Sequence, residues 1–284
     1  MNKSLLDSAQ DDTVDELTES TRAESVRILT QTLHQASESE NSKFWPAIHA
    51  AEALSSAGYF TEVKQTLTPL LKTDTNHQHR CGLAREVARA GDRSHVHVML
   101  DILAGEETSS HVHACESLFS VNERGDGKLL RTAMLQTQNP IKAIMAAGAF
   151  ARQEDSSAFA LLREHLQGAD PLSRQIAAWV LSYVGERCDI PALESGLEQA
   201  TAPVERAYFV HTLAALGEEA AQQELIRNFS SENATVRAYA AFYAHVAKLD
   251  SACDLLVELL NDPAVDVRVR AAHSLLASQQ RPQI

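Results

Sequence analysis

The chain repeats one pattern of apolar, mostly small residues every 31 to 33 positions. The repeated pairs are Ala50-Ala51, Leu83-Ala84, Ala114-Cys115, Ala146-Ala147, Ala177-Ala178, Phe209-Val210, Ala240-Ala241 and Ala271-Ala272. Subtracting the first member of each pair from the first member of the next gives 33, 31, 32, 31, 32, 31 and 31 residues. A period this constant predicts an array of similar helical units that bury a continuous core by stacking on one another.

Each period has the pattern of a helix pair. In residues 171–200, apolar side chains recur at i, i+3, i+4 and i+7, a glycine and an acidic residue follow at Gly185-Glu186, and a second amphipathic segment comes next. The same step occurs at Gly91-Asp92, Gly125-Asp126 and Gly217-Glu218. Glycine there can adopt the left-handed conformation that often ends a helix. Prolines lie where one helix is expected to end and the next to begin, at Pro140, Pro171, Pro203 and Pro263.

The last unit, NDPAVDVRVRAAHSLLA (Asn261 to Ala277), resembles the HEAT-like repeat family, in the short bacterial form that is also found in phycobilisome lyases. Weaker likenesses are NATVRAYAAFYAHV, APVERAYFVHTLAALGEE and LSRQIAAWVLSYVG, and the resemblance covers residues 43–279. It implies an all-α protein, a right-handed α-solenoid of eight HEAT-like helix pairs. It also implies a polar ladder between units, formed by an arginine three places before the small pair at Arg80, Arg174, Arg206, Arg237 and Arg268.

The domain organisation follows from the extent of the repeats. We expect a single solenoid domain over residues 21–284, whose first outer helix lies near Glu24 to Gln35. Residues 1–20 form a polar N-terminal tail with the composition of a disordered segment. No charged segment followed by an apolar run marks a signal peptide at the N-terminus, so we expect a cytoplasmic protein with no membrane contact.

Charge and cysteine content exclude several classes of function. The chain has 25 basic and 38 acidic residues, a formal net charge of -13, whereas binding to nucleic-acid phosphates requires a concentrated basic surface. The four cysteines are far apart and form no C-x-x-C pair, which is typical of small buried residues in a reducing compartment. We therefore expect no nucleic-acid partner and no bound cofactor.

The residues on either side of each small pair are predicted to line the concave groove of the solenoid. The first half of the chain places His, Glu and Arg at these positions, and the second half places mainly aromatic residues there. The predicted groove residues are His49, Glu52, Arg85, His113, Glu116, Trp179, Tyr208, His211, Tyr239, Phe242, Arg270 and His273. Aromatic side chains with polar groups are frequent anchors of recognition surfaces. The sequence therefore favours a non-enzymatic scaffold that binds a protein or peptide in this groove, with a basic partner preferred by the acidic chain.

Two alternatives place a small ligand or a metal ion in the same groove. IHAAEAL and VHACESL each carry His-x-x-Glu, which puts an imidazole and a carboxylate on one helix face, so His49, Glu52, His113 and Glu116 are a minority metal hypothesis. The resemblance also extends to HEAT-repeat enzymes, among them deoxyhypusine hydroxylase, in which His-Glu dipeptides hold iron. This chain has no His-Glu dipeptide. An enzyme, or a lyase that handles a chromophore, is the alternative to the scaffold.

Overall fold

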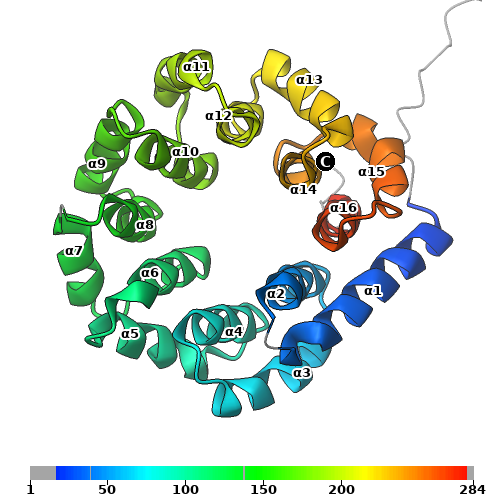
Figure 1. The fold of residues 1–284 in the computed structure, drawn as a ribbon, viewed down its shortest axis with the longest axis horizontal. Helices are drawn as coiled ribbons and strands as arrows, with labels where there is room; N and C mark the ends of the chain where they lie inside the picture. The colour runs from blue at the N-terminus through cyan, green and yellow to red at the C-terminus, as the bar shows by residue number, and fades with distance from the viewer. Residues whose placement is uncertain (1–16, 39, 137, 280–284) are drawn as a thin grey trace, which may run out of the picture.

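The computed structural model describes residues 17–38, 40–136 and 138–279 and contains only helices within these ranges. The helices alternate between an inner and an outer layer around a ring (Figure 1). The outer helices are α1 (Glu19–Leu33), α3 (Phe60–Thr73), α5 (Val96–Ala104), α7 (Lys128–Leu135), α9 (Ser156–Leu166), α11 (Ile190–Gln199), α13 (Glu219–Arg227) and α15 (Cys253–Leu259). The inner helices are α2 (Asn41–Ser56), α4 (His77–Arg89), α6 (His111–Ser120), α8 (Pro140–Ala151), α10 (Pro171–Val184), α12 (Pro203–Ala215), α14 (Ala234–Val246) and α16 (Val265–Ser278). The prediction of an all-α fold built from helix pairs is confirmed.

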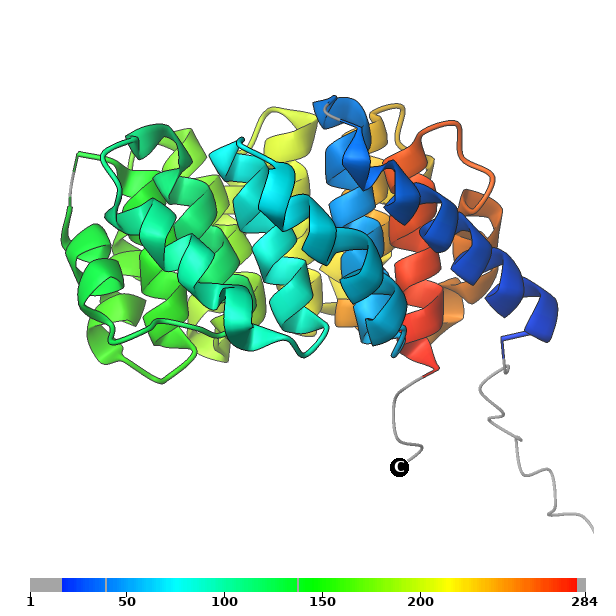
Figure 2. The same cartoon turned by 90° about the horizontal axis from the view of Figure 1, so that it is seen from below.

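The ring is closed by direct packing of its last inner helix on its first two helices. Helix α16 packs against α2 and α1 as well as against its neighbour α14. In Figure 1 the two ends of the colour scale lie side by side, and Figure 2 shows α1 crossing obliquely over the outside of this junction. The sequence predicted an open superhelix, so the closure is the main difference between the expected and the observed architecture.

The small pairs explain how closely the helices pack. Ala50, Ala51, Ala146 and Ala147 have no solvent-exposed surface, and the other predicted pairs are buried as well. Small side chains allow each inner helix to contact both its own outer helix and the next inner helix. The period in the sequence therefore corresponds to the line along which the inner helices touch.

Helix ends follow the predicted signals with one exception. Pro140, Pro171 and Pro203 each occupy the first position of an inner helix, and Asn139 and Asp170 accept backbone N–H bonds as N-caps. Pro46 is different, because α2 begins at Asn41 and Pro46 lies inside its first turns. There its ring removes the backbone N–H that would otherwise donate to the carbonyl of Ser42, four residues earlier in the same helix.

Two glycines end inner helices for different reasons. Gly217 has φ of +95°, a left-handed conformation that other residues resist. Gly185 has an ordinary φ, but a Cβ at this position would lie 2.4 Å from the carbonyl oxygen of Leu181. Both positions therefore require glycine.

The predicted arginine ladder forms in part of the ring. Arg237 donates to the carbonyl of Ser231 at 2.7 Å and to Asp262, and Arg268 donates to the carbonyl of Asp262 at 2.6 Å. Arg174 reaches the carbonyl of Gly168 and Glu205 in the same way. These bonds satisfy carbonyl groups in the segments between helices and connect adjacent units. Arg206 instead pairs with Glu224, so the ladder is not continuous.

The boundaries of the predicted domain are close to those of the helices. Helix α1 starts at Glu19, and Thr18 caps it through a bond from the backbone N–H of Thr21. The first 16 residues of the predicted tail lie outside the described residues. In the part of the chain that the structure describes, no helix combines the length and the apolar character needed to cross a bilayer.

Candidate functional site

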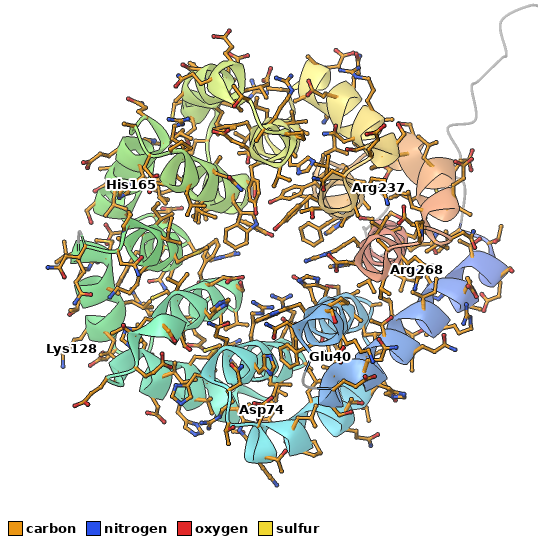
Figure 3. The ribbon with its side chains drawn as sticks, in the orientation of Figure 1. Glu40, Asp74, Lys128, His165, Arg237 and Arg268 are labelled. Atoms are coloured by element: carbon orange, nitrogen blue, oxygen red, sulfur yellow. The ribbon has the colours of Figure 1, made fainter. Side chains whose placement is uncertain are left out.

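The inner helices surround a cavity of about 220 Å³ at the centre of the ring. Figure 3 shows side chains of the inner helices pointing into the centre, whereas Lys128 and His165 lie on the outer side. The lining residues are His49, Glu52, Arg85, Arg89, Glu116, Ser120, Met145, Ile176, Trp179, Tyr183, Tyr208, Tyr239, Phe242 and Arg270. Pockets for drug-sized ligands usually measure roughly 300–1,000 Å³, so this cavity suits a smaller molecule.

One side of the cavity is a chain of alternating charges, which we call the charge belt. It consists of Glu116, Arg85, Glu86, Arg89, Glu52, Arg270, Asp266 and His49. The belt runs from α6 through α4 and α2 to α16, and it therefore crosses the junction where the ring closes.

The links of the belt begin at α6. Glu116 accepts from Arg85 at 3.5 Å, and Arg85 donates through Nε to Glu86 at 2.7 Å. Arg89 lies 3.5 Å from Glu86 and forms an ion pair with Glu52. Because Glu86 has no exposed surface, its carboxylate depends on these two arginines for charge compensation.

The belt continues across the junction of the ring. Arg270 donates to Glu52 at 3.4 Å and lies 3.9 Å from Asp266, which in turn lies 2.6 Å from Nδ1 of His49. Desolvation alone would raise the pKa of the Glu52 carboxyl, but Arg89 and Arg270 hold it well below its usual range. Desolvation also raises the pKa of the Asp266 carboxyl. The interactions with His49 and Arg270 outweigh this effect and lower the pKa to about 2.

The charges of the belt compensate one another. Three arginines face four carboxylates, so the sum is -1 with His49 neutral and 0 with His49 protonated. Each arginine of the belt has at least one carboxylate within 4.0 Å. The belt therefore fixes the cavity wall and has no spare cation to offer a ligand.

The opposite side is an aromatic wall made of Trp179, Tyr183, Tyr208, Tyr239 and Phe242. Trp179 and Tyr183 contact edge to face with ring centroids 5.3 Å apart, and the hydroxyls of Tyr208 and Tyr239 are hydrogen-bonded at 2.9 Å. Burial and the neighbouring Tyr208 raise the pKa of Tyr239 well above its usual value, so the Tyr239 hydroxyl stays protonated. Arg270 links the two sides, because its guanidinium lies 4.7 Å from the Phe242 ring centroid.

The structure brings most of the predicted groove residues to this cavity. His49, Glu52, Arg85, Glu116, Trp179, Tyr208, Tyr239, Phe242 and Arg270 line it. Three predicted groove residues do not line the cavity. His113 stacks on Trp45 at a centroid distance of 5.5 Å, while His211 and His273 are 1% and 3% exposed behind the aromatic wall.

The two buried histidines are neutral. Desolvation lowers the pKa of His211 to about 3, and its ring stacks on Tyr243 at 5.1 Å. For His273 desolvation, with a contribution from His245, lowers the pKa well below the ordinary value. These side chains act as core aromatic groups rather than as groups that meet a ligand.

Met145 and Ile176, each directly before a small pair, line the cavity although they are not among the predicted groove residues. Three further lining residues were missed by the sequence interpretation, namely Arg89, Ser120 and Tyr183. Each lies four residues after a predicted lining residue, since 85, 116 and 179 plus four give 89, 120 and 183. Residues four apart lie on the same helix face, so the helical period contained the signal.

The four residues of the minority metal hypothesis do not come together. His49 is bonded to Asp266, Glu52 lies between Arg89 and Arg270, and only His113 and Glu116 are near each other, at 3.7 Å. Arg89 and Arg270 already compensate the negative charge of Glu52, which a bound cation would have to use. The metal hypothesis for these residues is therefore wrong as a single site.

The one group of potential metal ligands found among the described residues lies away from the cavity. It consists of Glu186, Cys188 and Asp189, whose ligand atoms lie within 4.8 Å of one another. Arg163 donates to Asp189 at 2.6 Å and to Glu186 at 2.7 Å, so a guanidinium already occupies the cluster. The cluster is an ion-pair network between adjacent units.

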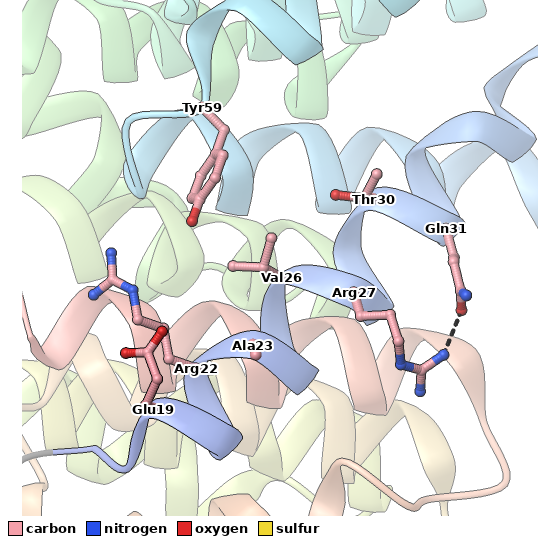
Figure 4. Close-up of a pocket in the computed structure, with 8 residues that line it drawn as sticks. All are labelled: Glu19, Arg22, Ala23, Val26, Arg27, Thr30, Gln31 and Tyr59. Carbon is pink, nitrogen blue, oxygen red and sulfur yellow. Dashed lines mark hydrogen bonds between the residues drawn. The ribbon is translucent and has the colours of Figure 1, made fainter.

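A larger but open hollow of about 450 Å³ lies on the outer face between α1 and the start of α3. Figure 4 shows Tyr59 above Val26 and a hydrogen bond of 2.7 Å between Arg27 and Gln31. Arg27 also pairs with the exposed Glu24. Arg27 is paired on its own helix and the hollow is open to solvent, so the central cavity is the better candidate site.

No family model matches the sequence, and no curated protein matches it. Among solved structures the chain is similar to that of human deoxyhypusine hydroxylase in complex with glycerol, over 92% of this chain and 98% of that one, at 20% identity and a TM-score of 0.43.

The prediction of a non-enzymatic scaffold with a peptide in its groove is wrong. Packing of α16 on α2 converts the expected groove into a small central cavity, which has no room for a peptide helix about 10 Å wide.

Proposed function

We propose that the chain holds a small organic molecule with an apolar, preferably aromatic, body in its central cavity, as an enzyme holds its substrate. The observation that carries this proposal is the pairing of an aromatic wall with a charge belt across one central cavity of about 220 Å³. Sites for small molecules are typically concave and mostly apolar, with a few polar groups that fix orientation.

The arrangement supplies two kinds of contact. The faces of Trp179 and Tyr208 offer apolar surface, and Met145 and Ile176 extend it along α8 and α10. Glu116, at the open end of the charge belt, has a single arginine partner at 3.5 Å. It is therefore the carboxylate of the belt that is freest to accept a bond or a proton from a bound molecule.

The proposal also covers the number and the handedness of the repeat units. It treats the ring as eight HEAT-like units of right-handed sense, in which the residues on either side of each small pair supply the cavity. The enzymatic class is proposed on the two-sided site, with Glu116 in the lining as the candidate group for proton transfer and the half-buried His113, 3.7 Å from Glu116 and outside the lining, as its partner. Desolvation lowers the pKa of His113, which favours a neutral imidazole able to accept a proton.

A thermal-shift screen of metabolite-sized compounds tests the proposal with a variant that fills the cavity. Ile176→Trp adds an indole ring to the lining, and Leu255→Trp, at a residue 38% exposed on α15, is the matched control. Compounds with an aromatic body are expected to raise the melting temperature of the wild type and of Leu255→Trp, and to leave that of Ile176→Trp unchanged. Equal shifts in the wild type and in folded Ile176→Trp would overturn the proposal.

A further inference from the structure

Arg152 lies beside the cavity, outside the residues that line it, and differs in this from Arg85, Arg89 and Arg270. It follows the last residue of α8, and its guanidinium lies 4.6 Å from the ring centroid of Phe119 and 5.8 Å from that of Tyr183. Tyr183 lines the cavity. Arg152 thus lies over the edge of the aromatic wall.

Arg152 has the same helical register as three residues that line the cavity. Arg89, Ser120 and Tyr183 lie four residues after the positions that follow the small pairs of their helices, and Arg152 lies four residues after Gly148, the same position in α8. Gly148 is closely packed, because a Cβ there would lie 3.0 Å from the side chains of Phe119 and Val180. The row therefore runs Arg89, Ser120, Arg152 and Tyr183 along the ring.

The charge of Arg152 is not matched within the protein. Among the described residues, no carboxylate oxygen lies within 4.0 Å of its guanidinium, whereas Arg85, Arg89 and Arg270 all have such a partner. Partial desolvation, together with the positive charge of Arg89, lowers the pKa of Arg152. Arg152 is exposed to solvent, so an anionic group can reach its guanidinium and supply the acidic partner that it lacks.

We propose that Arg152 binds the carboxylate of a monoanionic ligand whose aromatic body lies against the aromatic wall. This inference rests on the proposed function and names the class of ligand. One guanidinium can hold one carboxylate through two parallel N–H···O bonds. A phosphate dianion is disfavoured, because the charge belt has a net charge of -1 with His49 neutral and offers no second free arginine.

The test uses three probes of nearly the same shape and different charge, namely 3-phenylpropionate, 3-phenylpropionamide and 3-phenylpropylamine. Isothermal titration measures the dissociation constant of each with wild type, Arg152→Gln, Arg152→Lys and the control Arg227→Gln. Arg227 is on the outer helix α13 with 66% of its side chain exposed, so its substitution removes the same charge away from the cavity.

The expected result is selectivity of the wild type for the carboxylate, by about tenfold over the amide, because hydrogen bonds to a charged group are stronger than those to a neutral one. Arg152→Gln should lose this preference, Arg152→Lys should retain part of it, and Arg227→Gln should behave as the wild type. Equal binding of the amide or the amine to the wild type, or carboxylate selectivity unchanged in Arg152→Gln, would overturn the assignment. Binding of none of the three probes, in the wild type and in all variants, would contradict the proposed function itself.

Discussion

Nδ1 of His49 lies 2.6 Å from Oδ1 of Asp266, and this bond joins residues 217 positions apart in the chain. His49 belongs to the first inner helix and Asp266 to the last, so the bond spans the junction that closes the ring. Glu52 and Arg270 add a second contact between the same two helices at 3.4 Å. The charged wall of the cavity and the closure of the ring are thus formed by the same side chains.

Acid should weaken the junction through Asp266. Its pKa in the folded state is about 2, below the ordinary value, so the stabilisation is complete above the unfolded pKa of about 3.9 and is lost as the pH falls toward 2. Asp266→Asn should lower the free energy of unfolding at pH 7 by at most about 1 kcal/mol, because the carboxylate is partly exposed to solvent. Urea unfolding between pH 5 and 2 measures both effects. An acid dependence in Asp266→Asn as steep as in the exposed control Asp254→Asn would contradict the role of this carboxylate.

Glu52 should contribute much more to the free energy of unfolding than an acidic residue on the surface. Its removal as Glu52→Gln leaves Arg89 and Arg270 without their shared carboxylate, at 21% and 11% side-chain exposure. We expect a loss of about 2–3 kcal/mol in the free energy of unfolding, slightly below the range for fully buried pairs. The matched control is Glu24→Gln, which breaks an exposed ion pair with Arg27 and should cost less than about 0.5 kcal/mol. Similar losses in the two variants would show that the belt does not hold the ring together.

His211 should make the protein less stable in mildly acidic solution. Its folded pKa of about 3 is below the ordinary value, so the native state resists protonation while the unfolded state accepts a proton below about pH 6.5. Stability from this site is therefore lost as the pH falls from about 6.5 toward 3, by at most about 1.4 kcal/mol per pH unit. His211→Phe keeps the ring that stacks on Tyr243 and should flatten this dependence, whereas the exposed control His97→Phe should not. The check is the urea midpoint as a function of pH, and identical slopes for the two variants would refute the prediction.

The hydrogen bond between Tyr208 and Tyr239 should appear as a coupling energy. Tyr208→Phe, Tyr239→Phe and the double variant form a cycle in which only the hydroxyl pair at 2.9 Å is changed. We expect each single variant to cost about 0.5–1.5 kcal/mol and the double variant to cost less than their sum, because the second removal leaves no unpaired hydroxyl. Strict additivity in urea unfolding would mean that the two hydroxyls do not interact.

The sequence contained the positions of the inner helices and much of the cavity. The small pairs are placed where inner helices touch, so the residues beside Ala177-Ala178 or Ala240-Ala241 face the centre for a geometric reason. Arg89 and Tyr183 were not predicted, although they lie one helical turn after Arg85 and Trp179 and on the same helix faces.

Ring closure could not be predicted from the repeat pattern. Whether the ends meet depends on a small rotation between units that accumulates over the whole array, and no residue type reports it. The bond between His49 and Asp266 therefore has no local signal. His211 and His273 were predicted to line the groove because of their position beside a small pair. Their side chains instead point into the buried layer behind the tyrosines.

Fluorescence of Trp179 gives the most direct test of a ligand in the central cavity. The chain has two tryptophans, and Trp45→Phe leaves Trp179, which lines the cavity, as the single reporter. Titration of this variant with the compound that gives the largest thermal shift in the wild type should change the Trp179 emission with a saturable curve. Its midpoint should equal the dissociation constant from calorimetry. Calorimetric binding that leaves Trp179 emission unchanged at saturation would place the ligand elsewhere and contradict the account.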